Sequence, residues 1–104
     1  MYLDANQLTS LPAEIRQLTA LETLKLGGNQ LTSLPAEIWQ LPSLKVLYFS
    51  YNQLTSLPAE IGQLTSLREL DLRENQLTSV SAKIRKLRAA GCRVHLDDDV
   101  TVDE

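Results

Sequence analysis

The sequence predicts an α/β solenoid, in which short repeats stack side by side around a curved parallel β-sheet. Leucine accounts for 21 of the 104 residues, which is far above ordinary usage. The tetrad Asn-Gln-Leu-Thr also recurs every 23 residues, beginning at Asn6, Asn29, Asn52 and Asn75. A fixed period in this range is typical of solenoids, because each unit is too short to bury its own apolar face.

Three copies of the repeat are nearly perfect. The ten residues 6–15 recur unchanged at 29–38 and 52–61, and a degraded fourth copy spans 75–84. Upstream of the asparagines the spacing L-x-x-L-x-L-x-x-N is also fixed, with Phe49 in place of one leucine. Together with the Leu-Pro-x-x-Ile segment, this spacing resembles the leucine-rich repeat family over residues 1 to about 90. In particular it is similar to the 23-residue class of intracellular, Ras-interacting proteins and microbial arrays.

The resemblance implies a leucine-rich repeat solenoid, a right-handed horseshoe. Its short curved parallel β-sheet lies on the concave side, and short 3₁₀ or α turns lie on the convex side. The residue pattern agrees, since 24–26, 47–49 and 70–72 alternate with period two, as strands do. Pro35 fixes φ and suits the first position of a helical turn, so we expect such turns over 35–41.

The repeated asparagines, Asn6, Asn29, Asn52 and Asn75, admit two interpretations. They form either an amide ladder that binds a ligand or a structural ladder that satisfies backbone groups at the bend after each strand. We favour the structural ladder, because a buried amide must be hydrogen-bonded and identical spacing lets every copy do so.

We divide the chain into repeats over residues 1–80 and a C-terminal cap over residues 81–104. There are about four repeats, and the first is truncated at the N-terminus. Solenoids need a polar end, which the cap is expected to supply. Its acidic tail is expected to add a short edge strand through Val100 and Val102.

Within the cap we expect a helix over about 82–90 and a strand over about 93–96. Ser81 is a good N-cap, and Gly91 is a good C-terminal stop. A one-residue insertion near Gly91 separates this last strand from the regular 23-residue step.

The N-terminal end is expected to be open. Met1 and Leu3 occupy the positions of Leu24 and Leu26, so the chain begins inside a strand. The first coil should then expose apolar edges at Leu8, Leu11, Ile15 and Leu18. Bare strand edges and apolar surface invite pairing. One hypothesis is therefore a homodimer through Met1, Leu3, Leu8, Leu11 and Ile15, and the other is a fragment of a longer array.

The outward-facing strand positions differ between copies, whereas the return path hardly varies. The central column of this concave face holds Tyr2, Lys25, Tyr48, Asp71 and His95. A fixed scaffold with a variable face favours a binding surface over drift, because tyrosines, which offer large contact areas, sit among the charges. The candidate partner-binding residues are Tyr2, Lys25, Tyr48, Tyr51, Asp71, Arg73 and His95.

Two features lie on the convex side. Trp39 stands where other copies have Arg16, Gly62 and Arg85, so we expect it to face outward. It is either an anchor for a partner or, as we favour, it lies flat over the neighbouring return segments. The basic run 83–88 is interpreted as a solvated helix face rather than a site for phosphate or an acidic partner.

Several function classes are disfavoured by composition. Ten basic and 13 acidic residues give a net charge of −3, which argues against nucleic-acid binding. No apolar run is long enough to span a membrane, and the N-terminus lacks a signal peptide, so a cytoplasmic location is expected. The single cysteine, Cys92, cannot form an internal disulfide or hold a metal alone, and the residues 97–99 lack the spacing of a calcium loop. No cofactor or metal is expected.

Catalysis is also disfavoured by geometry. Cys92 and His95 are three apart in an extended segment, so they point to opposite faces. Asp71 and His95 are expected on adjacent strands about 5 Å apart, as a surface pair. Ser50 is two strands away from His95, about 10 Å, which is too far for proton transfer. We expect no enzyme activity.

The predicted function is a non-catalytic protein–protein interaction module that binds an unidentified protein through its concave face. The family resemblance implies the interaction, and the residues permit it. The alternative is a self-associating structural scaffold, or a fragment or near-consensus repeat protein with no dedicated ligand.

Overall fold

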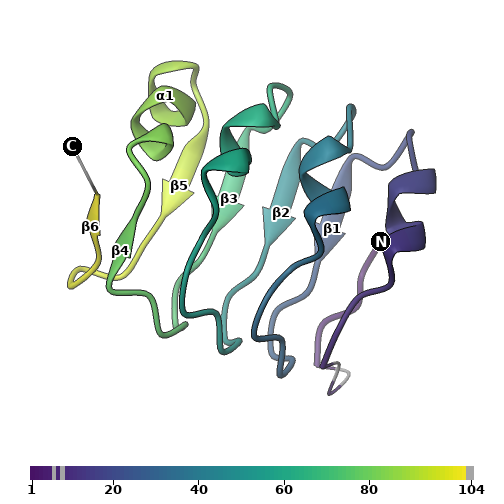
Figure 1. Cartoon of the computed structure of the whole chain (residues 1–104), viewed down its shortest axis with the longest axis horizontal. Helices are drawn as coiled ribbons and strands as arrows, with labels where there is room; N and C mark the ends of the chain where they lie inside the picture. The colour runs from purple at the N-terminus through teal and green to yellow at the C-terminus, as the bar shows by residue number, and fades with distance from the viewer. Residues whose placement is uncertain (6, 8, 103–104) are drawn as a thin grey trace.

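The computed structural model describes residues 1–5, 7 and 9–102, and it shows short coils stacked side by side along one axis (Figure 1). Four strands form a parallel sheet in the order β1-β2-β3-β5. Their bounds are Thr23–Lys25, Val46–Tyr48, Glu69–Asp71 and Arg93–His95. A single bridge from Tyr2 to Lys25 extends this sheet at its N-terminal edge. The predicted leucine-rich repeat solenoid is confirmed.

The strand register follows the sequence repeat. Lys25 pairs with Tyr48, Tyr48 with Asp71, and Asp71 with His95. The last step is one residue longer because the chain turns at Gly91, where φ is +97°. Equivalent residues of successive repeats therefore lie side by side on both faces of the sheet.

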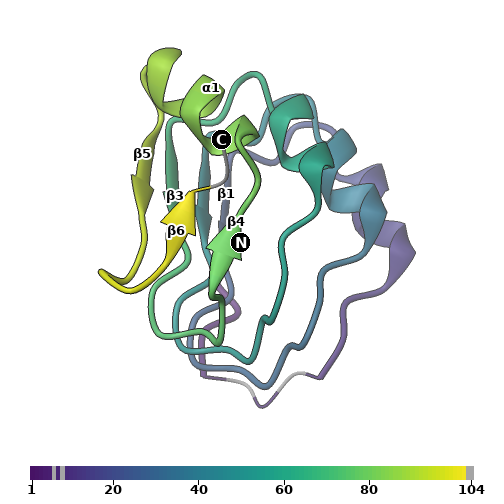
Figure 2. The ribbon, with the colours of Figure 1, turned by 60° about the vertical axis from the view of Figure 1, so that its left-hand side comes forward.

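The return path carries three 3₁₀ helices on the side opposite the sheet (Figure 2). They are η1 (Ala13–Gln17), η2 (Ala36–Gln40) and η3 (Ala59–Gln63). Pro35 lies just before η2 rather than at its first position, since its ψ of 147° is extended. Its carbonyl accepts a hydrogen bond from the Ile38 N–H, so the proline supplies an acceptor to the first turn.

The core fills the space between sheet and helices. Leu24, Leu47 and Leu70 point inward from the strands and are fully buried. Ile15 is also buried, with 6% exposure, so the expectation of an exposed edge there is wrong. The reason is that η1 packs against η2, which covers the inner face of η1.

Trp39 does not face solvent, and that prediction is wrong. The side chain is only 3% exposed and belongs to the apolar core cluster. An indole gains more free energy by lying against apolar neighbours than by pointing into water. Its burial agrees with the favoured interpretation, in which the ring packs on the neighbouring segments.

The C-terminal cap contains α1 (Lys83–Ala89), β5 and β6 (Thr101–Val102), and β4 (Ser79–Val80) directly precedes it. The helix is one residue shorter at each end than expected. β6 pairs in parallel with β4, in a sheet of their own, instead of extending the main sheet. The tail therefore folds back over the end of the last coil, as Figure 2 shows.

The predicted residues lie near both ends of α1, although the N-cap is Ala82 and Ser81 stands one residue before it. The Ser81 hydroxyl accepts a hydrogen bond from the Lys83 N–H at 3.2 Å. Beyond the helix, the Cys92 N–H donates to the Leu87 carbonyl and the Gly91 N–H donates to the Arg88 carbonyl. This pair of bonds, with a left-handed glycine, is the Schellman motif.

The asparagine side chains join each coil to the one before it. The Asn52 amide donates to the carbonyls of Leu26 (2.9 Å) and Ser50 (3.2 Å), and its oxygen accepts from the Leu31 N–H (3.1 Å). Asn29 and Asn75 make the equivalent bonds to the carbonyls of Leu3 and Phe49. The structural ladder is thus confirmed for these three residues, while Asn6 lies outside the described part of the chain.

Asn52→Ala should lower the free energy of unfolding by about 1–3 kcal/mol, because the buried Leu31 N–H loses its acceptor and the Leu26 carbonyl keeps only its bond from Asn29. Urea unfolding followed by circular dichroism measures this loss. Gln53→Ala, at an exposed neighbouring position, is the matched control. Equal losses for the two variants would contradict a structural role of the amide.

Candidate binding site on the concave face

The outer face of the sheet forms one shallow hollow of about 400 Å³. Five of the seven predicted binding residues meet there, and Asp4, Ser50 and Glu69 complete the lining. The five are Lys25, Tyr48, Asp71, Arg73 and His95. They meet because the parallel register places successive repeat equivalents next to one another.

The remaining two predicted residues, Tyr2 and Tyr51, lie at the margins. Tyr2 is 72% exposed at the N-terminal edge of the sheet. Tyr51 is 65% exposed and lines an adjoining hollow, which shares Ser50 and Arg73 with the first. Both rings offer large, accessible contact surfaces beside the central hollow.

The Lys25 side chain lies between the rings of Tyr2 and Tyr48 and makes a cation–π contact with each. Its ammonium lies 4.8 Å from the centre of the Tyr2 ring and 5.2 Å from that of the Tyr48 ring. At these distances the cation is attracted by both ring faces. The lysine therefore orders the aromatic side chains of two neighbouring coils.

Glu69 is at the centre of a hydrogen-bonded cluster, although it was not among the predicted site residues. The Tyr48 hydroxyl donates to Glu69 Oε1 at 2.8 Å, and His95 Nε2 lies 3.1 Å from Oε2. The hydrogen bond from Tyr48 and the contact with His95 hold the pKa of the Glu69 carboxyl below its usual range. The same bond raises the pKa of the Tyr48 hydroxyl.

One signal in the sequence does identify Glu69. Diagonal neighbours on adjacent strands are within reach of long side chains. Glu69 pairs with Val46 and Arg93, so it is diagonal to both Tyr48 and His95. A prediction based only on directly opposite residues misses such a contact.

Asp71 and His95 lie on adjacent strands as expected, but each side chain has another partner. The Arg73 guanidinium forms a bidentate ion pair with the Asp71 carboxylate, in which Nε donates to Oδ1 at 3.0 Å and Nη2 donates to Oδ2 at 2.8 Å. Burial alone would raise the pKa of Asp71, but the hydrogen bonds and charge of Arg73 lower it below its usual range. His95 then pairs with Glu69 instead.

Tyr51 adopts an unfavourable backbone conformation. Its φ is +56°, in the left-handed region that disfavours bulky side chains, and Glu74 shares it with a φ of +58°. The equivalent residue one repeat earlier is Gly28, which adopts this region at no steric cost. The fold requires this conformation at each bend, so a tyrosine here costs stability while presenting an exposed ring.

The chemistry of the hollow is ion pairing, hydrogen bonding and aromatic contact. Cys92 is buried in the core, where burial raises the pKa of its thiol, while His95 lies on the outer face. Over residues 1–5, 7 and 9–102, no cluster of three or more His, Cys, Asp or Glu is placed to hold a metal. No helix in the same ranges is long and apolar enough to cross a membrane.

A second surface lies at the N-terminal end, where an apolar groove of about 370 Å³ is open. Leu18 is 36% exposed, as predicted, and Met1 is 44% exposed. The residue equivalent to Leu18 in the next coil, Leu41, is only 2% exposed because a preceding coil covers it. The groove is lined by Met1, Leu3, Leu11, Pro12, Glu14, Ile15 and Leu18, while Leu8 lies outside the described residues.

Comparisons with known proteins agree with the geometry. A protein-family model described as a leucine-rich repeat region matches residues 1–98. A solved leucine-rich repeat protein of Leptospira interrogans is similar, with 39% sequence identity and a TM-score of 0.82. The match covers 92% of this chain and 24% of that one, so this chain spans about a quarter of its length. No curated protein matches the chain.

Stability should fall on acidification as the Glu69 and Asp71 carboxylates become protonated. Because their pKa values are lowered in the folded state, the unfolded chain binds more protons below about pH 4, which favours unfolding. Glu69→Gln should flatten part of this dependence, measured by thermal melting from pH 7 to pH 3. Glu14→Gln, on η1, is the matched control, and an identical pH dependence in the two variants would contradict the cluster.

Proposed function

Because this chain belongs to the leucine-rich repeat family, we propose that it binds a protein partner through the hollow on its concave face. Family membership supports a protein-interaction module in general. The finer assignment to the concave face rests on the chain's own residues. We propose that this role is non-catalytic, since Ser50 and His95 lie at strands separated by β3.

The observation that carries the proposal is where the repeats differ. The first three return segments repeat ten residues without change, whereas the outer strand positions carry Lys25, Tyr48, Asp71 and His95 in succession. Tyrosine and arginine are the residue types that dominate binding energy in protein interfaces. The exposed ring of Tyr51 adds support, because a tyrosine stands where the preceding coil has the unstrained Gly28.

The hollow also indicates what the partner must offer. Lys25 and Arg73 contribute positive charge, while Asp4, Glu69 and Asp71 contribute negative charge. Most of these charged groups already pair with other groups of the chain. A ligand with a single charge would therefore have to break these existing contacts in order to bind. A partner with an apolar ring or methylene surface and a mixed-charge rim fits best.

Replacement of Lys25 and Arg73 by glutamate should abolish partner capture while the fold survives. A photoreactive amino acid at Tyr48 is expected to cross-link a specific protein, and the double reversal should reduce that product at least about tenfold. Capture is measured by mass spectrometry of the cross-linked products.

The control places the same photoreactive group at Gln40, on the convex side, and reverses Arg16 and Lys86. Products common to Tyr48 and Gln40 are background. If the concave reversal leaves the Tyr48 product unchanged, or the convex reversal removes it, the proposed face is wrong.

A second candidate is self-association, which the open apolar groove at the N-terminal end favours. We propose a homodimer that buries Met1, Leu11 and Leu18 against a second copy. Burial of apolar side chains is the main driving force for such association. The segment at Tyr2 and Leu3, which pairs with β1 on one side, adds backbone groups that can pair with a second copy.

Leu18→Lys should convert such a dimer into a monomer, because it places a charge inside the buried patch. Light scattering over a range of concentrations measures the molar mass, which is 11.6 kDa for one copy. Ala20→Lys, an equal charge change at an exposed neighbour, should leave the dimer intact. A monomer in the unmodified chain, or a dimer that survives Leu18→Lys, would rule out this interface.

A further inference from the structure

Two departures from the repeat meet on the convex side. Every earlier 3₁₀ helix reads Ala-Glu-Ile-x-Gln, but in the last coil lysines replace the glutamate and the glutamine, at Lys83 and Lys86. On the facing helix η3, position x is Gly62, where the other coils carry an arginine or a tryptophan. The two new lysines on α1 and the glycine on η3 thus lie on neighbouring elements.

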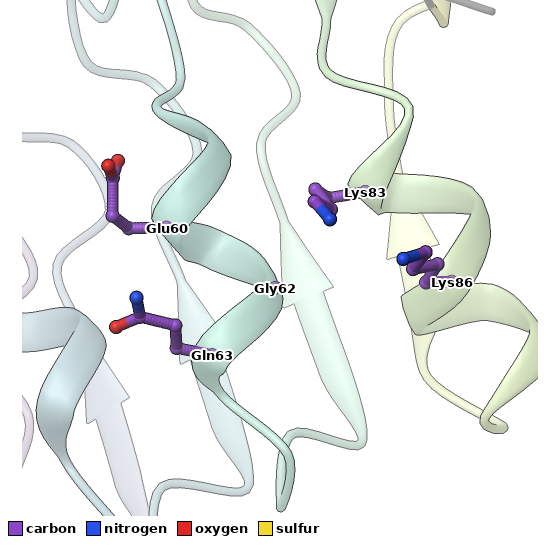
Figure 3. Close-up of a pocket in the computed structure, with 5 residues that line it drawn as sticks. All are labelled: Glu60, Gly62, Gln63, Lys83 and Lys86. Atoms are coloured by element: carbon purple, nitrogen blue, oxygen red, sulfur yellow. The ribbon is translucent and has the colours of Figure 1, made fainter.

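These departures create a hollow of about 380 Å³ between η3 and α1, shown in Figure 3. It is lined by Glu60, Gly62, Gln63, Lys83 and Lys86. The space depends on the glycine, because a Cβ at Gly62 would lie 3.4 Å from both Cβ and Cδ of Lys83. A large side chain at position 62 would fill the hollow.

Both lysine side chains enter this gap from α1, and their ammonium groups approach each other (Figure 3). The Glu60 and Gln63 side chains extend from η3 in the opposite direction, away from α1. In the described part of the chain, no carboxylate lies within 4 Å of either lysine. The approach of Lys86 lowers the pKa of the Lys83 ammonium, as expected for two like charges without a counter-ion.

The other cations of α1 have structural partners. Arg85 donates a hydrogen bond to the Val102 carbonyl, and Arg88 donates one to the Val94 carbonyl. These two side chains hold the cap together. Among residues 1–5, 7 and 9–102, the side chains of Lys83 and Lys86 make no such bond to the cap, and we infer that their paired charge is available to a ligand.

We propose that the hollow between η3 and α1 is a binding site for a phosphate group. Two converging ammonium groups match the charge of a phosphate monoester, which carries about −1.5 to −2 at pH 7 and accepts several charge-assisted hydrogen bonds. The hollow is open to solvent on one side, so the group that carries the phosphate can extend outward. This site lies on the convex side and is independent of the concave binding face.

The test titrates the full chain with inorganic phosphate and with O-phosphoserine, and follows the four lysine side-chain amino groups by NMR. Saturable shifts are expected at Lys83 and Lys86, beyond the changes caused by chloride at equal ionic strength. Tighter binding of O-phosphoserine would indicate a phosphate carried on a larger molecule, and equal binding would indicate a site for the free anion.

The double variant Lys83→Gln, Lys86→Gln should weaken phosphate binding at least about tenfold. Lys25→Gln with Lys45→Gln removes the same charge elsewhere and is the matched control. Gly62→Trp should also block binding, because the indole fills the hollow without a change in charge. If Gly62→Trp does not fold, phosphate binding by the Lys83→Gln, Lys86→Gln variant still tests the proposal.

Two results would overturn the proposal. The first is a response to phosphate that is no larger than the response to chloride. This result would mean that the two lysines do not bind phosphate, for instance because the Glu60 carboxylate neutralises them. The second is equal weakening by the lysine pair and by its control, which would indicate unspecific attraction to net positive charge.

Discussion

The structure depends on the hydrogen bonds of the repeated asparagines. Each amide reaches back to a carbonyl of the preceding coil, from Asn29 to Leu3, from Asn52 to Leu26 and from Asn75 to Phe49. These bonds occur at the bend between strand and return path, where neither sheet nor helix can satisfy the backbone. Because the side chain must sit at the same place in every coil, the ladder fixes the step between coils. The sheet register, the stacking of the 3₁₀ helices and the leucine core all follow that step.

A fixed step has a direct consequence for binding. Residues 23 positions apart become neighbours, so single substitutions within the repeat build a continuous surface. On the concave side this brings Lys25 between two tyrosine rings and Glu69 between Tyr48 and His95. On the convex side it brings the lysines of α1 opposite Gly62. The inward-facing strand positions stay apolar in successive coils, which explains how one scaffold carries two chemically different surfaces.

The sequence predicts whatever depends on the repeat step and fails where side chains choose among neighbours. The strands, the order of the concave column and the asparagine ladder follow from spacing alone. The partner of His95 does not, because Arg73 competes for Asp71 and a diagonal contact to Glu69 is equally within reach. Trp39 is misplaced for a similar reason, since position in the repeat sets where the Cβ points but not where a large ring settles. Ile15 is buried like its repeat equivalents Ile38 and Ile61, so its repeat position is a better guide than its place in the first coil.

The most direct test of the central claim is amide hydrogen exchange of the whole chain, measured by NMR. The Leu31 and Leu54 amides donate to asparagine side chains of the following coil and to no strand. If the ladder fixes the step between coils, these two amides should be protected as strongly as that of Leu26, which donates to the Tyr48 carbonyl next to the sheet. Exchange at Leu31 and Leu54 as fast as in the exposed turns would show that the coils are held together without the ladder, and would contradict the account.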